Sequence, residues 1–186
     1  MRHGQTLFNV RRKIQGWCDS PLTELGIKQA LAAHHLVKDI HFDHYYSSTS
    51  ERCCDTMELV MPNRSYVRLK GLRERFSGTF EGESEDLNPK SLEEFDALFP
   101  KFGGESIEQL KQRMWTTLNE IMNKEDHHCV FAVSSSGAMI VFASIMEGQN
   151  FINDAFQYGF PNCGIMHFEI EQDKWQLKEI LKPEVK

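Results

Sequence analysis

The sequence predicts an α/β fold with a largely parallel sheet. Segments whose apolar residues have helical spacing alternate along the chain with short strand-like segments, which is the pattern of strands joined by crossover helices. Residues 129–133 form an uninterrupted apolar run, as expected of a strand that helices bury on both faces. The alternation indicates the fold class, and the apolar run indicates a strand at the centre of the sheet.

Length and composition favour a single domain. The chain has 186 residues, of which 40% are hydrophobic, enough for one full core and too few for two large domains. A formal net charge of −6 argues against nucleic acid or a membrane surface as partner. No apolar run reaches transmembrane length, and we expect no signal peptide.

The cysteines predict a reducing compartment. Their number is odd, and they are scattered without the spacing of a zinc site: Cys18, Cys53, Cys54, Cys129 and Cys163. We interpret them as reduced thiols of a cytoplasmic protein, and we expect neither a bound metal nor a cofactor.

Two helices and two strands are predicted in the first 70 residues. Thr23 is suited to cap a helix whose apolar residues recur at near-helical spacing through Val37. Three elements follow in order: a strand at 45–48, a helix at 51–60 that opens near Ser48 or Ser50, and a strand at 66–69. Residues 10–21 and 72–82 are predicted to be loops.

The second half begins with an insertion. Residues 77–104 contain an acidic and polar stretch with prolines and glycines, so we expect a mobile excursion near the active site, with one short helix near 91–99. The elements predicted after it are a helix at 106–123, the buried strand at 129–133, a helix at 138–146 and strands at 164–170 and 175–180.

Polar residues follow several of the predicted strands. In sheets of this kind, ligands bind at the carboxyl ends of the strands. That rule selects four loops: the one after residue 3, the one at Ser47 and Ser48, the one at Glu74, and residues 134–137. Each loop carries groups that could bind phosphate or transfer a proton.

The first of these loops opens with Arg2, His3 and Gly4. Arginine is a permanent cation whose planar set of donors matches phosphate oxygens. Histidine is a nitrogen nucleophile that is substantially neutral near pH 7. Glycine lets the backbone approach a bound anion closely. The triplet is therefore a candidate phosphate site, although an Arg and a His in a mobile chain end would look the same.

Further motifs follow in a fixed order over nearly the whole chain. They are Gln5-Thr6 with Asn9, Gln15-Gly16, Pro21-Leu22-Thr23-Glu24-Leu25-Gly26 with Gln29-Ala30, Tyr46-Ser47-Ser48 with Arg52 and Thr56, Leu72-Arg73-Glu74 with Gly78 and Glu81-Gly82, and Gly104-Glu105-Ser106 with Arg113 and Asn162. With the opening triplet, they resemble the histidine phosphatase superfamily in its phosphoglycerate-mutase-like branch. The resemblance implies a three-layer α/β/α sandwich with a mostly parallel central sheet, and one such domain over residues 1–186.

The resemblance also implies roles for the catalytic residues. His3 would attack phosphorus and form a phosphohistidine, while Arg2 and Arg52 would clamp the non-bridging oxygens. Glu74 would protonate the leaving oxygen and then activate water, for which burial beside a phosphate could raise its pKa. Glu81 is the competing carboxylate in the same loop.

Five further residues are expected to bind phosphate or substrate. The resemblance implies that Asn9 and Gln15 contact the ligand, while Gly16 keeps the wall of the pocket thin. Ser135 and Ser136 lie in the loop after the buried strand.

Ser135 departs from the family pattern. The family's second histidine belongs at this position, in a motif close to Ser-His-Gly, whereas this chain reads Ser134-Ser135-Ser136-Gly137. A serine hydroxyl is shorter and uncharged, and losing one transition-state donor costs about 10²–10³ in rate. His127 and His128 lie at the opposite end of the strand, so we do not expect them to replace it.

The N-terminus is the second departure. Family members run an apolar strand into the Arg-His-Gly triplet, and here only Met1 precedes it. We expect truncation or a misassigned start rather than the loss of a central strand, because a lost strand would expose its neighbours' edges.

The sequence thus predicts a phosphomonoesterase that acts on a small phosphorylated metabolite. Two alternatives stay open: phosphoglycerate-mutase-type phosphoryl transfer, and a catalytically weakened protein that binds phosphorylated ligands, which Ser135 favours. The substrate has no recognition motif in the sequence. A homodimer is likewise an open alternative.

Overall fold

Three parallel strands in the order β2-β1-β3 form the central sheet of the computed structural model, which describes residues 1–89 and 91–185. The strands are β1 (His44–Ser48), β2 (Val67–Leu69) and β3 (Val130–Val133). In the register of the sheet, Tyr46 of β1 lies opposite Val67 on one side and Ala132 on the other. The strands predicted at 45–48, 66–69 and 129–133 are therefore present and parallel.

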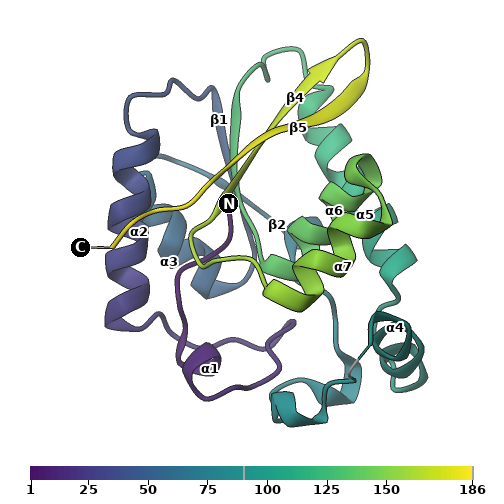
Figure 1. Cartoon of the computed structure of the whole chain (residues 1–186). Helices are drawn as coiled ribbons and strands as arrows, with labels where there is room; N and C mark the ends of the chain where they lie inside the picture. The colour runs from purple at the N-terminus through teal and green to yellow at the C-terminus, as the bar shows by residue number, and fades with distance from the viewer. Residues whose placement is uncertain (90, 186) are drawn as a thin grey trace.

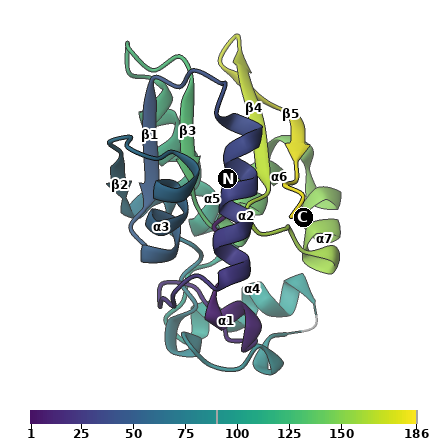
Figure 2. The same cartoon turned by 90° about the vertical axis from the view of Figure 1, so that its left-hand side faces the viewer.

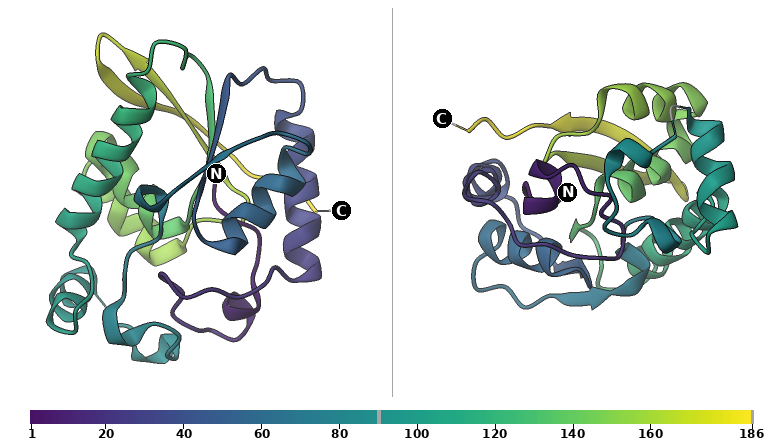
Figure 3. Two further views of the ribbon diagram at one scale, coloured as in Figure 1. Left: turned by 180° about the vertical axis from the view of Figure 1, so that it is seen from behind. Right: turned by 90° about the horizontal axis from the view of Figure 1, so that it is seen from below.

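Helices cover both faces of this sheet (Figure 1). On one side lie α2 (Glu24–Val37) and α3 (Glu51–Val60), and on the other lie α5 (Ile107–Met122), α6 (Ser136–Glu147) and α7 (Gln149–Tyr158). The view from behind shows the same layers (Figure 3, left). This arrangement confirms the predicted α/β fold class.

Strand periodicity divides the core into two halves. Successive side chains of a strand point to opposite faces, so Tyr45 packs with the α2 and α3 side while Tyr46 packs with the α5 and α6 side. Phe131 and Val133 on β3 likewise belong to the α2 and α3 half. The apolar run at 129–133 thus supplies side chains to both halves, as its lack of alternation predicted.

The last two strands form an antiparallel hairpin, β4 (Ile165–Glu171) and β5 (Lys174–Leu181). Gln172 and Asp173 have φ of 51° and 63°, the geometry of a tight turn between twisted strands. The predicted strands at 164–170 and 175–180 are therefore present, but they are paired with each other and not with the parallel sheet.

Residues 1–3 lie between β3 and the start of β4. The His3 amide donates to the Ser134 carbonyl oxygen at 3.1 Å, and the Arg2 amide donates to the Gly164 carbonyl oxygen at 2.9 Å. Seen from below, this segment occupies the middle of the molecule, between the two helical sides (Figure 3, right). The Arg-His-Gly triplet is therefore ordered by backbone hydrogen bonds to the ends of other strands.

The loops at the carboxyl ends of the strands gather at one end of the molecule, with α1 (Leu7–Val10) and α4 (Leu92–Lys101) (Figures 1 and 2). Three short 3₁₀ turns, Lys70–Leu72, Gly78–Phe80 and Glu85–Leu87, lie in the segment before α4. Part of the insertion pairs with the N-terminal loop, since the Ile14 amide donates to the Glu83 carbonyl oxygen at 2.8 Å. Helix α4 matches the short helix predicted near 91–99.

Two helices have no counterpart among the predicted elements. Helix α1 is a single turn held by a capping box between Thr6 and Asn9, a local arrangement too short to have a hydrophobic period. Helix α7 follows α6 after Gly148 alone and packs Phe151 and Ile152 on the same core half as α6. Among the described residues, no helix is both long and apolar enough to span a bilayer.

Candidate active site

His3 is buried, with 4% of its surface exposed, and its ring has a defined tautomer. Its Nδ1 lies 2.8 Å from the Gly4 carbonyl oxygen. A carbonyl oxygen only accepts hydrogen bonds, so Nδ1 carries the proton and Nε2 keeps its lone pair. Burial, reinforced by the charges of Arg52 and Arg2, lowers the pKa of His3 well below 6.5. The ring is therefore neutral at pH 7, the form in which Nε2 can act as a nucleophile.

Arg52 is fully buried on the first turn of α3. The loop at 16–19 holds its terminal nitrogens: Nη1 donates to the Cys18 carbonyl oxygen at 2.9 Å and to Asp19 Oδ1 at 3.0 Å, and Nη2 donates to the Gly16 carbonyl oxygen at 2.8 Å. The remaining donor, Nε, is buried without a partner. The guanidinium group is thus fixed in place with one unused N–H.

Arg2 has the same feature. Its Nη1 donates to the Phe160 carbonyl oxygen, and its Nε is buried without a partner. Burial lowers the pKa of Arg2, and the charge of Glu74 opposes that shift. Buried donors are rarely left unpaired, because each such group costs about 1–3 kcal/mol. The unpaired Nε–H groups of Arg2 and Arg52 therefore make these two arginines a candidate anion site.

Glu74 lies at the N-terminus of α6. Its Oε2 accepts from the Gly137 amide at 2.8 Å, and its Oε1 accepts from the amides of Ala138 at 2.9 Å and Arg75 at 2.7 Å. A Cβ atom at Gly137 would lie 2.6 Å from Oε1, so only glycine permits this approach. The carboxylate is held by backbone donors at a helix N-terminus, where negative charge is favourable.

Glu81 is placed for a different task. Its Oε1 accepts from the amides of Trp17 at 2.8 Å and Ser77 at 2.9 Å, and its Oε2 accepts from the Cys18 amide at 2.8 Å. Both oxygens are therefore used to join the loop at 16–19 to the insertion. Glu74 also accepts from backbone amides through both oxygens, so hydrogen bonding alone does not separate the two carboxylates. The charge of Glu74 acts on Arg2, which makes Glu74 the candidate beside the arginines.

The side chains of Asn9 and Gln15 both accept hydrogen bonds from Thr6. Asn9 Oδ1 accepts from the Thr6 amide at 3.0 Å, and Gln15 Oε1 accepts from the Thr6 hydroxyl at 2.7 Å. A Cβ atom at Gly16 would lie 2.2 Å from Glu81 Oε1 and 2.4 Å from the Arg75 carbonyl oxygen. Glycine is thus required at position 16 by close contact with the loop at 75–81, and a role in the wall of the pocket stays a prediction.

Ser135 is buried beside the arginine clamp. Its Oγ lies 3.4 Å from Arg52 Nη2 and 3.8 Å from Cys53 Sγ. The loop after β3 therefore brings Ser135 to Arg52, and the residue has no charge to offer there. Ser136 is the first residue of α6 and half-buried.

Arg113 positions the Glu74 loop, a role that the sequence motifs left unassigned. Its guanidinium group pairs with both oxygens of Glu105, each at 2.7 Å, and also donates to the carbonyl oxygens of Gly71, Arg73 and Glu74 at 2.8–3.1 Å. In the sequence, this half-buried arginine and the carboxylate eight residues before it are visible only as two charges. Their convergence on the loop depends on the tertiary structure.

Aromatic residues lie at the edge of this region. The Trp17 indole N–H donates to the Glu74 carbonyl oxygen at 3.0 Å, and its ring contacts Phe76 at 4.6 Å and the Arg73 guanidinium at 4.9 Å. Trp17 is 40% exposed. Phe80 instead packs against Phe99 at 5.4 Å, which assigns it to packing rather than to a substrate wall.

Comparison with known proteins shows the family of this chain. The profile of the histidine phosphatase superfamily (branch 1) matches residues 1–182. The chain belongs to this superfamily, as the resemblance of its motifs predicted.

Individual relatives have phosphatase and mutase names. The chain is 28% identical over 94% of its length to the "Probable phosphoglycerate mutase GpmB" of Proteus mirabilis, of which the match covers 85%. It is 32% identical over 75% of its length to the metal-independent phosphoserine phosphatase of Arabidopsis thaliana, of which the match covers 63%. The phosphoglycerate mutase of Bacillus anthracis str. Sterne has a similar structure, with a TM-score of 0.81 and 25% identity over 95% of this chain and 88% of that one.

Proposed function

We propose that the protein is a metal-independent phosphomonoesterase that hydrolyses a small phosphorylated metabolite through a phosphohistidine on His3. The observation that carries this proposal is the pair of buried arginines, Arg2 and Arg52, each with an unpartnered Nε beside a neutral, buried histidine. The oxygens of a bound phosphoryl group would accept hydrogen bonds from both Nε–H groups, and His3 would attack its phosphorus. The phosphatase names among the relatives support the same class of substrate.

In the first step, His3 Nε2 attacks phosphorus, and the bond from phosphorus to the ester oxygen breaks. The tautomer set by Gly4 leaves the Nε2 lone pair available for this attack. Arg2 and Arg52 stabilise the charge on the non-bridging oxygens. Glu74, in its protonated form, gives its proton to the leaving oxygen.

In the second step, water attacks the phosphohistidine. Glu74, now a carboxylate, accepts a proton from that water as the new P–O bond forms and the P–N bond breaks. Inorganic phosphate leaves, and His3 returns to its neutral form. The Gly137 and Ala138 amides would orient the Glu74 side chain in this step, when it is a carboxylate.

The test is the His3→Ala variant. Brief mixing of the wild-type protein with a phosphate ester should trap an acid-labile phosphoenzyme, and His3→Ala should form none while keeping its circular dichroism spectrum. His35→Ala, which removes an exposed histidine of α2, is the matched control and should behave as wild type. Full hydrolysis by His3→Ala would rule out the proposed nucleophile.

A catalytically weakened phospholigand-binding protein is the second candidate, and Ser135 is the observation that favours it. If this position has only lost its histidine, Ser135→His should raise the phosphatase rate by about 10²-fold, since one transition-state donor is worth about 10²–10³. The neighbouring Ser136→His is the control and should give no such gain. An unchanged rate in a stably folded Ser135→His variant would indicate that serine suits the present substrate.

Mutase activity is the remaining alternative, favoured by the names of several relatives. The two reactions differ in the fate of the phosphoryl group. A mutase returns it to the substrate and requires 2,3-bisphosphoglycerate for priming, whereas a phosphatase passes it to water. Assaying 3-phosphoglycerate with and without that bisphosphate, and following both release of phosphate and isomerisation, separates them.

A further inference from the structure

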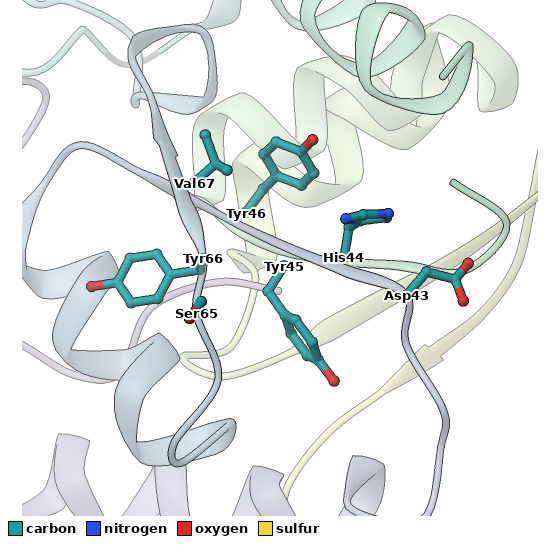
Figure 4. A pocket seen from close by; sticks show the side chains of 7 residues that line it. All are labelled: Asp43, His44, Tyr45, Tyr46, Ser65, Tyr66 and Val67. Atoms are coloured by element: carbon teal, nitrogen blue, oxygen red, sulfur yellow. The ribbon is translucent and has the colours of Figure 1, made fainter. Parts of the chain in front are cut away.

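Two histidines and an aspartate meet at the end of the sheet opposite to His3. His44 is the first residue of β1, and Asp126 and His127 precede β3, where the register pairs His44 with Val130. His44 and Tyr46 help to line a hollow of about 250 Å³ beside β1 and β2. Figure 4 shows these two side chains on the same side of β1, with Tyr45 on the other. None of the residues that line this hollow belongs to the candidate active site.

The three side chains present their ligand atoms to one another. The imidazole rings of His44 and His127 stack with centroids 3.6 Å apart and planes 9° apart. The Asp126 carboxylate bridges them, with Oδ1 2.8 Å from His127 Nδ1 and Oδ2 3.0 Å from His44 Nε2. One ligand atom from each residue lies within 4.8 Å of the other two.

The buried Tyr46 orients His127 on the side away from Asp126. Its Nε2 lies 2.8 Å from the Tyr46 hydroxyl, which also accepts from Lys124 Nζ at 2.9 Å. The side chain of His127 is 4% exposed, and that of Asp126 is 72% exposed. The cluster therefore has a fixed, buried side and an open side through which an ion could enter.

We propose that His44, Asp126 and His127 form a site for a divalent transition-metal ion of the zinc type. Zinc binds imidazole nitrogen and carboxylate oxygen at about 2.0–2.2 Å, so tetrahedral ligand atoms lie roughly 3.3 Å apart. In the stacked arrangement the ring lone pairs lie in separate, nearly parallel planes, and His44 Nε2 also lies 3.1 Å from the Asp126 carbonyl oxygen. Binding one ion through both rings therefore requires the half-exposed His44 ring to turn out of the stack. Water would complete the coordination on the open side.

The hydrogen bond to Tyr46 fits this role. A ligating histidine donates its other ring N–H to an oriented acceptor, which fixes its tautomer. With zinc on Nδ1, His127 would carry its proton on Nε2 and donate it to the Tyr46 hydroxyl oxygen. The ion would join the start of β1 to the turn before β3, segments about 80 residues apart in the chain, and so stabilise the sheet at a distance from the chemistry.

Cobalt and zinc titrations of the EDTA-treated, full-length protein test the proposal. One equivalent of Co²⁺ should give the visible absorption of a tetrahedral nitrogen and oxygen site, and Zn²⁺ should displace it and raise the Tm. His44→Ala and Asp126→Ala should abolish both effects, and Tyr46→Phe should weaken binding about 10–100-fold. His44 and Asp126 are chosen because neither is fully buried.

His41→Ala is the matched control, because this histidine is 92% exposed and lies three residues from His44. It should leave the titration unchanged. Three outcomes would overturn the proposal: no binding to the wild-type protein, equal binding by wild type and His44→Ala, or a sulfur-to-cobalt charge-transfer band that assigns the ion to a cysteine.

Discussion

Burial and two guanidinium groups keep the His3 ring neutral, and this makes folding sensitive to acid. The pKa of His3 is well below 6.5 in the folded protein and returns to its ordinary value on unfolding. Between those two pKa values the unfolded chain binds more protons, so the free energy of unfolding rises with pH in that window. The contribution of the neutral His3 ring to the free energy of unfolding is complete above about pH 6.5. It is lost as the pH falls toward the pKa of His3 in the folded protein.

We therefore expect acidification from about pH 7.5 to about pH 5.5 to destabilise the wild-type protein more than the His3→Asn variant. Urea unfolding at both pH values measures the difference. His41→Asn, at an exposed position, should follow the wild type. If the free energy of unfolding falls equally in the wild-type protein and in His3→Asn on acidification, the assigned environment of His3 is wrong.

At the scale of elements, the candidate site depends on how helices hold loops. Helix α5 contributes Arg113, which binds Glu105 and three carbonyl oxygens of the loop that leads to Glu74. Helix α6 contributes its N-terminal amides, which bind the Glu74 carboxylate. The position of Glu74 is thus set from two sides by elements far from it in sequence.

Arg113→Lys should loosen this loop. Lysine cannot pair with both Glu105 oxygens and reach the same carbonyl groups, so we expect kcat to fall by about 10–100-fold, since a displacement near 1 Å has that effect. The free energy of unfolding should fall by about 1–3 kcal/mol. Steady-state kinetics and urea unfolding measure both, with the exposed Arg64→Lys as control. Unchanged kinetics would show that Arg113 does not position Glu74.

At the scale of the whole molecule, an aromatic cluster joins the hairpin to the helical layer. The ring of Phe142 on α6 lies 5.2 Å from Phe168 on β4 and 5.1 Å from Trp175 on β5. Phe142 is 1% exposed. Because residues 1–3 lie between β3 and the start of β4, this packing also supports the segment that carries His3.

Phe142→Ala should destabilise the protein by about 3–5 kcal/mol through lost burial and a cavity. Ile145→Ala, on the same helix but 39% exposed, should cost much less and is the matched control. Urea unfolding followed by tryptophan fluorescence measures both variants. Similar losses in the two would contradict the assigned role of Phe142 at the junction.

Much of the fold is predictable from the sequence because it depends on local periodicity. Apolar residues at helical spacing locate α2 and α5, and the uninterrupted run at 129–133 locates β3. Helix α7 is not predictable in this way, because it needs the packing of Phe151 and Ile152 on a core built by other elements. The pairing of β4 with β5 is not predictable either, because the pattern of residues in a strand does not specify which other strand it pairs with.

The residue types of the candidate site were readable in the sequence, because phosphate chemistry requires a nucleophilic nitrogen, fixed cations and a carboxylate. On that basis and from the order of the motifs, the sequence predicts His3, Arg2, Arg52 and Glu74 as site residues. Their protonation states and contacts were not readable, since these depend on burial and on neighbours distant in the chain. Only the tertiary structure leaves Nε of both arginines unpaired and gives Glu74 and Glu81 their backbone amide donors. The physical reason is that these hydrogen bonds join residues distant in the sequence, which meet only in the folded chain.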